Sequence, residues 1–123
     1  MSDDISRLPP QVQERLLRYQ QLQQSLQSVL VQKQQVELEL TEIEQALTEL
    51  KNMADDVVLY KSIGSLLVKS EKDKTVAGLA ERNELLSTRT TVLGKHEERL
   101  RGQLKDLQTK IQQDLGPVSQ APP

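Results

Sequence analysis

The spacing of apolar residues along two long stretches constrains the fold of this chain more than any other feature. The first stretch, from Gln11 to Ala54, has neither Gly nor Pro and is rich in Gln, Leu and Glu, which favour helix. Its apolar residues alternate three and four positions apart, and this alternation averages the period of a coiled coil. They are Tyr19, Leu22, Leu26, Val29, Val36, Leu40, Ile43, Leu47 and Leu50. Lys33 interrupts the series, where it either fixes the register of the helices or lays its stem along the seam while its amine reaches water.

A second stretch, residues 71–115, has the same period. Leucine recurs there every seven residues, at Leu79, Leu86, Leu93, Leu100 and Leu107. The alternate seam positions are Asn83, Thr90, Glu97, Leu104 and Ile111, so this seam becomes apolar toward the C-terminus. Three glycines off the seam indicate a helix that bends, is approached closely or is under weak local selection: Gly78, Gly94 and Gly102. Because Pro9-Pro10 favours a helix start and Gly116-Pro117 a helix end, we expect helices over residues 9–54 and 71–115.

Between the two stretches lies a segment of different composition, residues 57–70. β-Branched and apolar residues stand on both sides of Gly64-Ser65, which predicts a β-hairpin. Both faces of this hairpin carry apolar side chains, and a lone hairpin is marginal in water, so we expect it to pair with other strands. The residues expected to make this assembly contact are Val57, Val58, Leu59, Tyr60, Ile63, Gly64, Leu66, Leu67 and Val68. The run from Lys69 to Lys74 alternates in charge and is typical of a solvated turn.

These elements predict a mainly α fold of one domain, residues 9–115. Because the hairpin reverses the chain, the two helices can pack as an antiparallel coiled coil. Residues 1–8 are expected to be flexible and residues 116–123 disordered. The two helix ends far from the hairpin are called the tip below, and their apolar residues either close the coiled coil or contact an unfolded client protein. The tip residues are Ile5, Leu8, Val12, Leu16, Leu17, Ile111 and Leu115.

The composition argues against several classes of protein. The 123 residues include no Cys, which excludes disulfides, catalytic thiols and thiolate metal sites and fits a reducing compartment. A net charge of −2 gives no general attraction to nucleic acid or anionic membranes. The acidic, polar start MSDDISRLPP predicts no signal peptide, and no run approaches the length of a membrane span, so we expect a cytoplasmic protein. The lone His96 makes no zinc site, and we expect no metal, no cofactor and no enzymatic activity.

Three segments together resemble the β-class subunits of prefoldin. The first helix of those subunits is similar to QVQERLLRYQQLQQSLQSVLVQKQQVELELTEIEQALTEL, and their hairpin is similar to VVLYKSIGSLLVK. Their second helix is similar to ELLSTRTTVLGKHEERLRGQLKDLQTKIQ. In the hairpin, Tyr60-Lys61 precedes the turn residue Gly64, as in the family. The resemblance covers residues 8–115, and the hairpin midway between the helices makes it specific, because any coiled coil resembles any other.

This resemblance implies a hexamer of two α-class and four β-class subunits, in which the hairpins join in a β-barrel and the coiled coils extend from it. A single hairpin is typical of the β class, and the short chain is more typical of archaeal than of eukaryotic members. The implied function is that of an ATP-independent chaperone, which holds unfolded or nascent proteins at the coiled-coil tips and delivers them to a group II chaperonin. The implied partners are an α-class prefoldin subunit, unfolded clients and the chaperonin, with no nucleic acid and no membrane.

Three other functions or folds remain as alternatives. A coiled-coil scaffold or adaptor without client-holding activity explains the heptads but not the hairpin. A helical hairpin that binds nucleic acid requires a basic stripe, whereas the charges here are interspersed. A helical monomer similar to the tubulin cofactors has no strands, and residues 57–69 argue against it.

Overall fold

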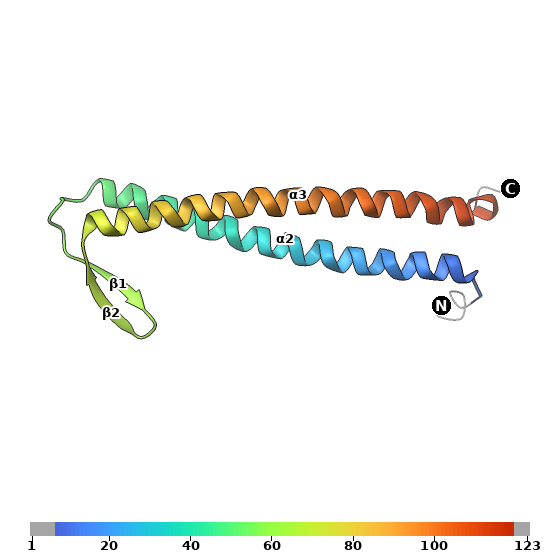
Figure 1. The fold of residues 1–123 in the computed structure, drawn as a ribbon, viewed down its shortest axis with the longest axis horizontal. Coiled ribbons are helices and arrows are strands. Elements are labelled where there is room, and N and C mark those ends of the chain that lie inside the picture. Colours follow the sequence, from blue (N-terminus) through green and yellow to red (C-terminus); the bar gives the residue numbers. More distant parts are fainter. Residues whose placement is uncertain (1–6, 120–123) are drawn as a thin grey trace. The chain divides into compact units, whose positions relative to one another are not determined.

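The chain forms two long helices, and a hairpin lies between them in the sequence (Figure 1). The computed structural model describes residues 7–119, with side chains as far as Leu115. Its elements follow in the order α2 (Pro10–Lys51), β1 (Leu59–Ile63), β2 (Leu66–Ser70) and α3 (Lys72–Ser119). The predicted fold class, mainly α with a small hairpin between two long helices, is therefore confirmed.

Helix α2 begins at its double proline, as the sequence predicts. Val12 and Gln13 donate their backbone N–H groups to the carbonyl oxygen of Pro9, at 2.9 and 3.1 Å. Pro10 stands at the first helical position, where a missing N–H leaves no intrahelical bond unmade. The side-chain amide of Gln13 also donates to the carbonyl of Leu8 at 2.7 Å, and this bond holds Leu8, which lies just before the helix, against the first turn.

The far end of α2 lies earlier than predicted, at Lys51 rather than at residue 54. Asn52 and Met53 donate their backbone N–H groups to the carbonyls of Glu49 and Leu50, both at 3.1 Å. These bonds span three residues instead of four, so they tighten the last turn and end the α-helix. Asn also favours helix ends over helix interiors, because its side chain competes for backbone groups.

Helix α3 is longer than predicted, since it continues to Ser119 through residues 116–119 of the expected tail. The expectation that Gly116-Pro117 ends the helix is therefore wrong. Proline removes one intrahelical N–H and its ring strains the preceding turn, but its fixed φ is compatible with a helix, so near the helix end these costs need not stop the last turn. At its start, Thr75 donates its backbone N–H to the Glu71 carbonyl at 3.0 Å, which places the first helical residue at Lys72.

The hairpin is a regular antiparallel pair that a two-residue turn closes. Its register runs from Leu59 opposite Ser70 to Ile63 opposite Leu66. Gly64 has a φ of 59°, whereas Ser65, like the other described non-glycine residues, has no positive φ. A positive φ at the first central residue alone defines a type II′ turn, which favours glycine there. The glycine that marks the turn in the sequence is thus required by the backbone.

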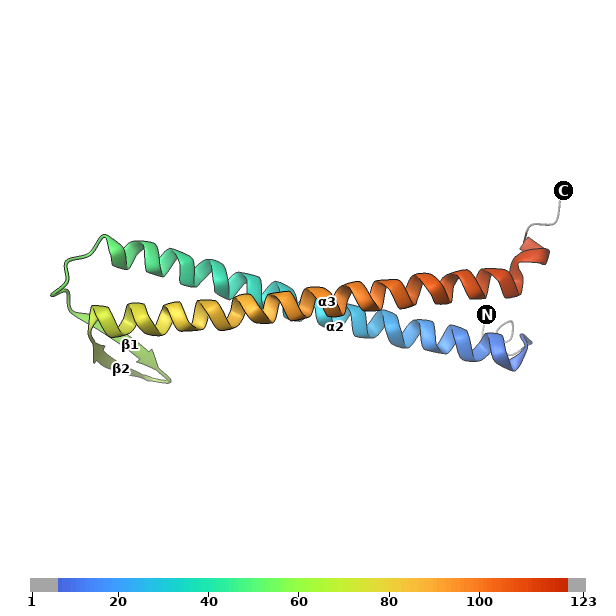
Figure 2. The same cartoon turned by 45° about the horizontal axis from the view of Figure 1, so that its top comes forward.

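The first packed unit combines residues 7–32 with residues 93–119. Here the start of α2 packs against the end of α3, and the two run antiparallel (Figure 2). Its buried apolar residues are Val12, Val29, Leu93, Leu100, Leu107 and Ile111. An ion pair between Arg15 and Asp114 joins the two helices across the seam.

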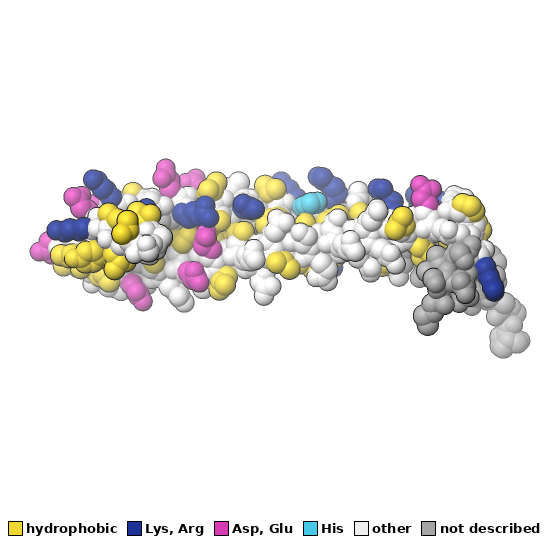
Figure 3. All heavy atoms as spheres, turned by 90° about the horizontal axis from the view of Figure 1, so that it is seen from below, with side chains coloured by type: hydrophobic (Ala, Val, Ile, Leu, Met, Phe, Trp, Pro, Cys, Tyr) yellow, Lys and Arg dark blue, Asp and Glu magenta, His cyan; other side chains and the backbone are white. Residues whose placement is uncertain are grey.

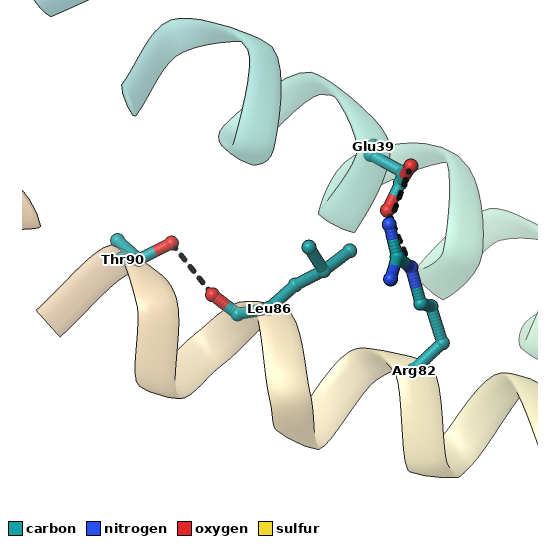
Figure 4. A network of polar contacts seen from close by, with 4 residues as sticks. All are labelled: Glu39, Arg82, Leu86 and Thr90. Atoms are coloured by element: carbon teal, nitrogen blue, oxygen red, sulfur yellow. Dashed lines mark hydrogen bonds and ion pairs between the residues drawn. The ribbon is translucent and has the colours of Figure 1, made fainter. Parts of the chain in front are cut away.

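The second packed unit consists of residues 33–92, in which the end of α2 packs against the start of α3. Its buried apolar residues are Val36, Ile43, Leu50 and Leu86. Arg82 donates to the carboxylate of Glu39 through Nε at 2.9 Å and Nη2 at 3.4 Å, so a forked ion pair flanks the seam (Figure 4). Thr90, a polar seam residue, donates its hydroxyl to the Leu86 carbonyl at 3.0 Å, which satisfies it within α3.

The seam has a deeply buried row and a more open row. In α2, four residues seven apart are buried, Val29, Val36, Ile43 and Leu50, and Leu22 before them in the same row is half-buried. The alternate row of α2 is half-buried at Tyr19, Leu26, Leu40 and Leu47 and buried at Val12 near the helix start. Apart from Val12, these are the predicted seam positions, so the coiled-coil pattern is confirmed. In each unit, the half-buried residues leave apolar surface accessible beside the seam.

The three glycines of α3 have space beside them. Apart from the adjoining backbone of α3 itself, no atom of the described chain lies within 4 Å of the position that a side-chain methyl would take at Gly78, Gly94 or Gly102. Helix α3 runs unbroken past all three positions. Within this chain, close approach of another segment therefore does not explain why they are glycines.

Candidate functional site

The hairpin presents apolar side chains on both of its faces. Residues that pair directly across an antiparallel ladder lie on the same face. One face therefore carries Leu59, Lys61, Ile63, Leu66 and Val68, and the other carries Tyr60, Ser62, Leu67 and Lys69. Figure 3 shows apolar side chains gathered over the end of the molecule that carries the hairpin. A hairpin that is free in water usually has one polar face, whereas both faces of this hairpin carry apolar side chains.

Most of these apolar side chains are exposed in the isolated chain. Their exposed fractions range from 45% at Val68 to 72% at Leu67, and only Leu59 is half-buried. The sheet has just two strands among the described residues, so each strand also has an outer edge free of a neighbouring strand. Exposed apolar faces and open edges are the features that associate with further strands. The hairpin is therefore the surface of this chain best suited to assembly.

The nine residues predicted for assembly do not all lie in the hairpin. Val58 is exposed and Val57 is half-buried in the connection before β1, where Val57 donates its backbone N–H to the Ala54 carbonyl at 3.2 Å. The other seven lie in the two strands and their turn. The surface predicted for assembly thus comprises the hairpin and the short connection before it.

Lys72 connects the start of α3 with the segment that follows α2, next to the hairpin. Lys72 donates from its amine to the Met53 carbonyl at 2.7 Å and forms an ion pair with Asp55 at 3.3 Å. The Lys72 side chain is largely buried, whereas that of Asp55 is fully exposed, so the carbonyl contact is the better sheltered of the two. This contact ties the end of α2 to the start of α3. The charge pattern of residues 69–74 predicts a solvated turn and gives no sign of this contact, because no local pattern marks a partner nineteen residues away.

The predicted tip residues are mostly sheltered. Val12 and Ile111 are buried, with exposed fractions of 4% and 9%, and only Leu17 is largely exposed, at 56%. Leu8, Leu16 and Leu115 are half-buried. Ile5 lies outside the described residues. The structure thus brings Val12 and Ile111 into the seam and leaves Leu17 on the surface beside it.

The described residues offer little to chemistry that needs a metal or a deep cleft. No group of three or more His, Cys, Asp and Glu side chains among residues 7–115 is placed to hold a metal ion. No helix in the described part of the chain is long and apolar enough to cross a membrane. His96 is exposed, and the hollows along the helices are open to solvent.

Comparison with known proteins agrees with the sequence resemblance. The family model described as "Prefoldin subunit" matches residues 13–117. The prefoldin subunit beta of Methanosarcina acetivorans is 44% identical over 115 residues, which cover 94% of this chain and 98% of that protein. That of Thermococcus kodakarensis is 46% identical over 113 residues, covering 92% and 97%.

Solved structures give the same result. The crystal structure of the prefoldin beta subunit from Thermococcus strain KS-1 superposes with a TM-score of 0.79 at 45% identity, covering 95% of this chain and 98% of that one. The beta2 subunit from the same strain has a TM-score of 0.67 at 23% identity and covers 74% of this chain, so it supports the fold alone.

Proposed function

Because the chain belongs to the prefoldin β-subunit family, we propose that it is a subunit of an ATP-independent holding chaperone in the cytoplasm. Prefoldin is a family of chaperones rather than of enzymes, and its subunits assemble into hetero-oligomers. In our proposal this chain assembles with an α-class subunit, as four copies with two, holds unfolded or nascent proteins at its tips and passes them to a group II chaperonin.

The observation that carries the proposal is the hairpin with exposed apolar residues on both faces. A coiled coil that only spaces or scaffolds other proteins needs no such element, since its seam is already filled. Strands from other subunits would pair with both edges of this hairpin, as closure into a barrel requires, and other parts of the assembly would cover its faces. The proposed assembly thus gives Leu66, Leu67 and Tyr60 the burial that the isolated chain does not give them.

The holding step is proposed at the tip. Leu17 offers exposed apolar surface there, and half-buried Leu16 and Leu115 lie close to the helix ends. Helix ends open more readily than helix interiors, so buried Val12 and Ile111 become available when the ends separate. Each tip would bind weakly, and several tips acting on one unfolded chain would bind well by multivalency.

A scaffold or adaptor without client-holding activity is the second candidate. The burial of Val12 and Ile111 favours it, because residues that close the coiled coil within one chain need no client. It shares the assembly step with the first candidate and differs only at the tip.

Native mass spectrometry of the chain, alone and mixed with an α-class subunit of the same source, tests the assembly. We expect a hetero-hexamer that forms only with the partner. The assembled complex should then suppress aggregation of heat-denatured citrate synthase without ATP. A stable homo-oligomer indifferent to the partner, or an assembled complex that leaves aggregation unchanged, would favour the scaffold.

A further inference from the structure

A hollow beside the half-buried residues of the seam differs in chemistry from the tip and the hairpin. It is open to solvent, has a volume of about 720 Å³ and lies within the unit formed by residues 7–32 and 93–119. Its apolar lining comes from Tyr19 and Leu26 of α2 and Leu104 of α3, all half-buried. The seam is thus accessible to another molecule at this point.

Glutamines form the polar part of the hollow. Four of them line it along α2: Gln20, Gln23, Gln24 and Gln27. All four are exposed, so their amides are accessible to a ligand. A glutamine amide carries two N–H donors and a carbonyl acceptor, the same kinds of group as the peptide backbone. This lining therefore matches an uncharged ligand that both donates and accepts hydrogen bonds.

Other hollows on the described residues have a different lining. One is bordered by Glu81, Arg82 and Glu84, a second by Glu44 and Glu49, and a third by Arg18, Asp106 and Lys110. Charged side chains at these hollows keep their water and favour ions over neutral groups. The residues that line the glutamine hollow include no charged side chain, which favours a neutral occupant.

The spacing of the glutamines suits an extended chain. Residues three and four apart on a helix have their Cβ atoms about 5–6 Å apart. Peptide groups that face the same way along an extended chain recur about every 6.6 Å, a difference that flexible glutamine side chains can span. From Gln20 to Gln27 the helix rises about 10 Å, the length of roughly three extended residues.

We propose that this hollow binds the extended backbone of an uncharged segment of an unfolded protein, through hydrogen bonds to glutamine amides above an apolar floor. The inference rests on the proposed holding function and adds a second contact to it. Because the glutamine amides form hydrogen bonds with the client's backbone rather than with its side chains, clients of different sequence can bind. It is also short, so it contributes mainly when several subunits hold one client.

The test uses the complex assembled with its α-class partner and a fluorescently labelled, end-blocked, unstructured peptide of Ala, Leu, Ser and Gly. Gln23→Glu with Gln27→Glu keeps the side-chain size but replaces amide donors by charge, and should weaken peptide binding about tenfold in fluorescence anisotropy. The control is Gln34→Glu with Gln35→Glu, at exposed glutamines of α2 outside this hollow. Gln34 lies seven residues after Gln27, so it has the same position in the heptad, and binding should be unchanged.

A second peptide, N-methylated on alternate backbone amides, separates backbone recognition from side-chain recognition. This N-methylated peptide should bind the wild-type complex several-fold more weakly than the parent peptide does. The hollow variant, with Gln23→Glu and Gln27→Glu, should bind the N-methylated peptide at least as tightly as it binds the parent peptide. If the hollow variant binds the parent peptide as tightly as the wild type, or N-methylation has no effect, the inference is wrong. Should the complex still suppress citrate synthase aggregation in that case, the proposed function stands without the hollow. Absence of suppression by the wild-type complex overturns the proposed function and this inference with it.

Discussion

The hairpin and the tip are both rich in apolar residues, yet most of those in the hairpin are exposed, whereas the described tip residues other than Leu17 are buried or half-buried. Leu66 and Leu67 stay exposed in a regular, hydrogen-bonded hairpin, whereas Val12 and Ile111 are buried in the seam. Contiguous apolar surface that the chain leaves exposed favours association with another subunit, while surface that is already covered becomes available only if the helices separate. Assembly can therefore be inferred from the static structure more directly than client binding can.

The largest effect should come from placing a charge on the hairpin. In Leu67→Glu, assembly would bury an unpaired carboxylate at a cost of about 3–5 kcal/mol, which should abolish the complex. The chain itself should stay helical by circular dichroism, because Leu67 is 72% exposed. The matched control is Leu38→Glu, at a residue of α2 that is 62% exposed, and it should assemble normally in native mass spectrometry. An intact complex with Leu67→Glu would show that the hairpin is not the assembly surface.

The tip should separate stability from holding. Ile111→Ser removes a buried side chain and should lower the free energy of unfolding by about 2–4 kcal/mol in urea titrations. Leu17→Ser changes an exposed residue and should alter stability by no more than about 0.5 kcal/mol. If the tip holds clients, Leu17→Ser should nevertheless weaken suppression of citrate synthase aggregation. Unchanged suppression by this variant would move the holding site away from Leu17.

The same contrast explains how much the sequence could predict. Heptad spacing predicts the seam because burial in a coiled coil follows directly from position along the helix. The turn at Gly64 is predictable because a two-residue hairpin requires a positive φ there. Both features depend on local sequence, so no knowledge of distant contacts is needed.

Features that depend on contacts between distant residues are harder to predict from the sequence. The heptad pattern places Val12 and Ile111 at the tip, but which tip residues are buried depends on how the two helix ends meet. The contact of Lys72 with the Met53 carbonyl depends on where α2 ends, and the sequence placed that end too late. The glutamine hollow likewise combines α2 with Leu104 of α3, so no single stretch of sequence marks it.

The junction of Lys72 allows an intermediate test on the hairpin side. Lys72→Met keeps the length of the side chain but removes the hydrogen bond to the Met53 carbonyl, a loss of about 1–3 kcal/mol in local stability. Lys74→Met is the control, because this exposed lysine lies in the same first turn of α3 and has the same unfavourable charge at a helix start. Hydrogen exchange at the backbone N–H of Val57 should accelerate in the first variant and not in the second. Equal exchange in both would mean that Lys72 does not hold the junction.

The smallest effects should come from the two ion pairs that join the helices, one near the tip and one in the unit that carries the hairpin. The side chains of Arg15 and Asp114 are about one quarter exposed, whereas those of Arg82 and Glu39 are about one half exposed. Since water and salt screen exposed pairs more strongly, Asp114→Asn should cost more than Glu39→Gln, with both below about 1 kcal/mol. Urea titrations at low and high salt measure this, and the difference should shrink as salt rises. If Glu39→Gln costs more instead, the forked geometry of its pair with Arg82 outweighs the shelter of the pair at the tip.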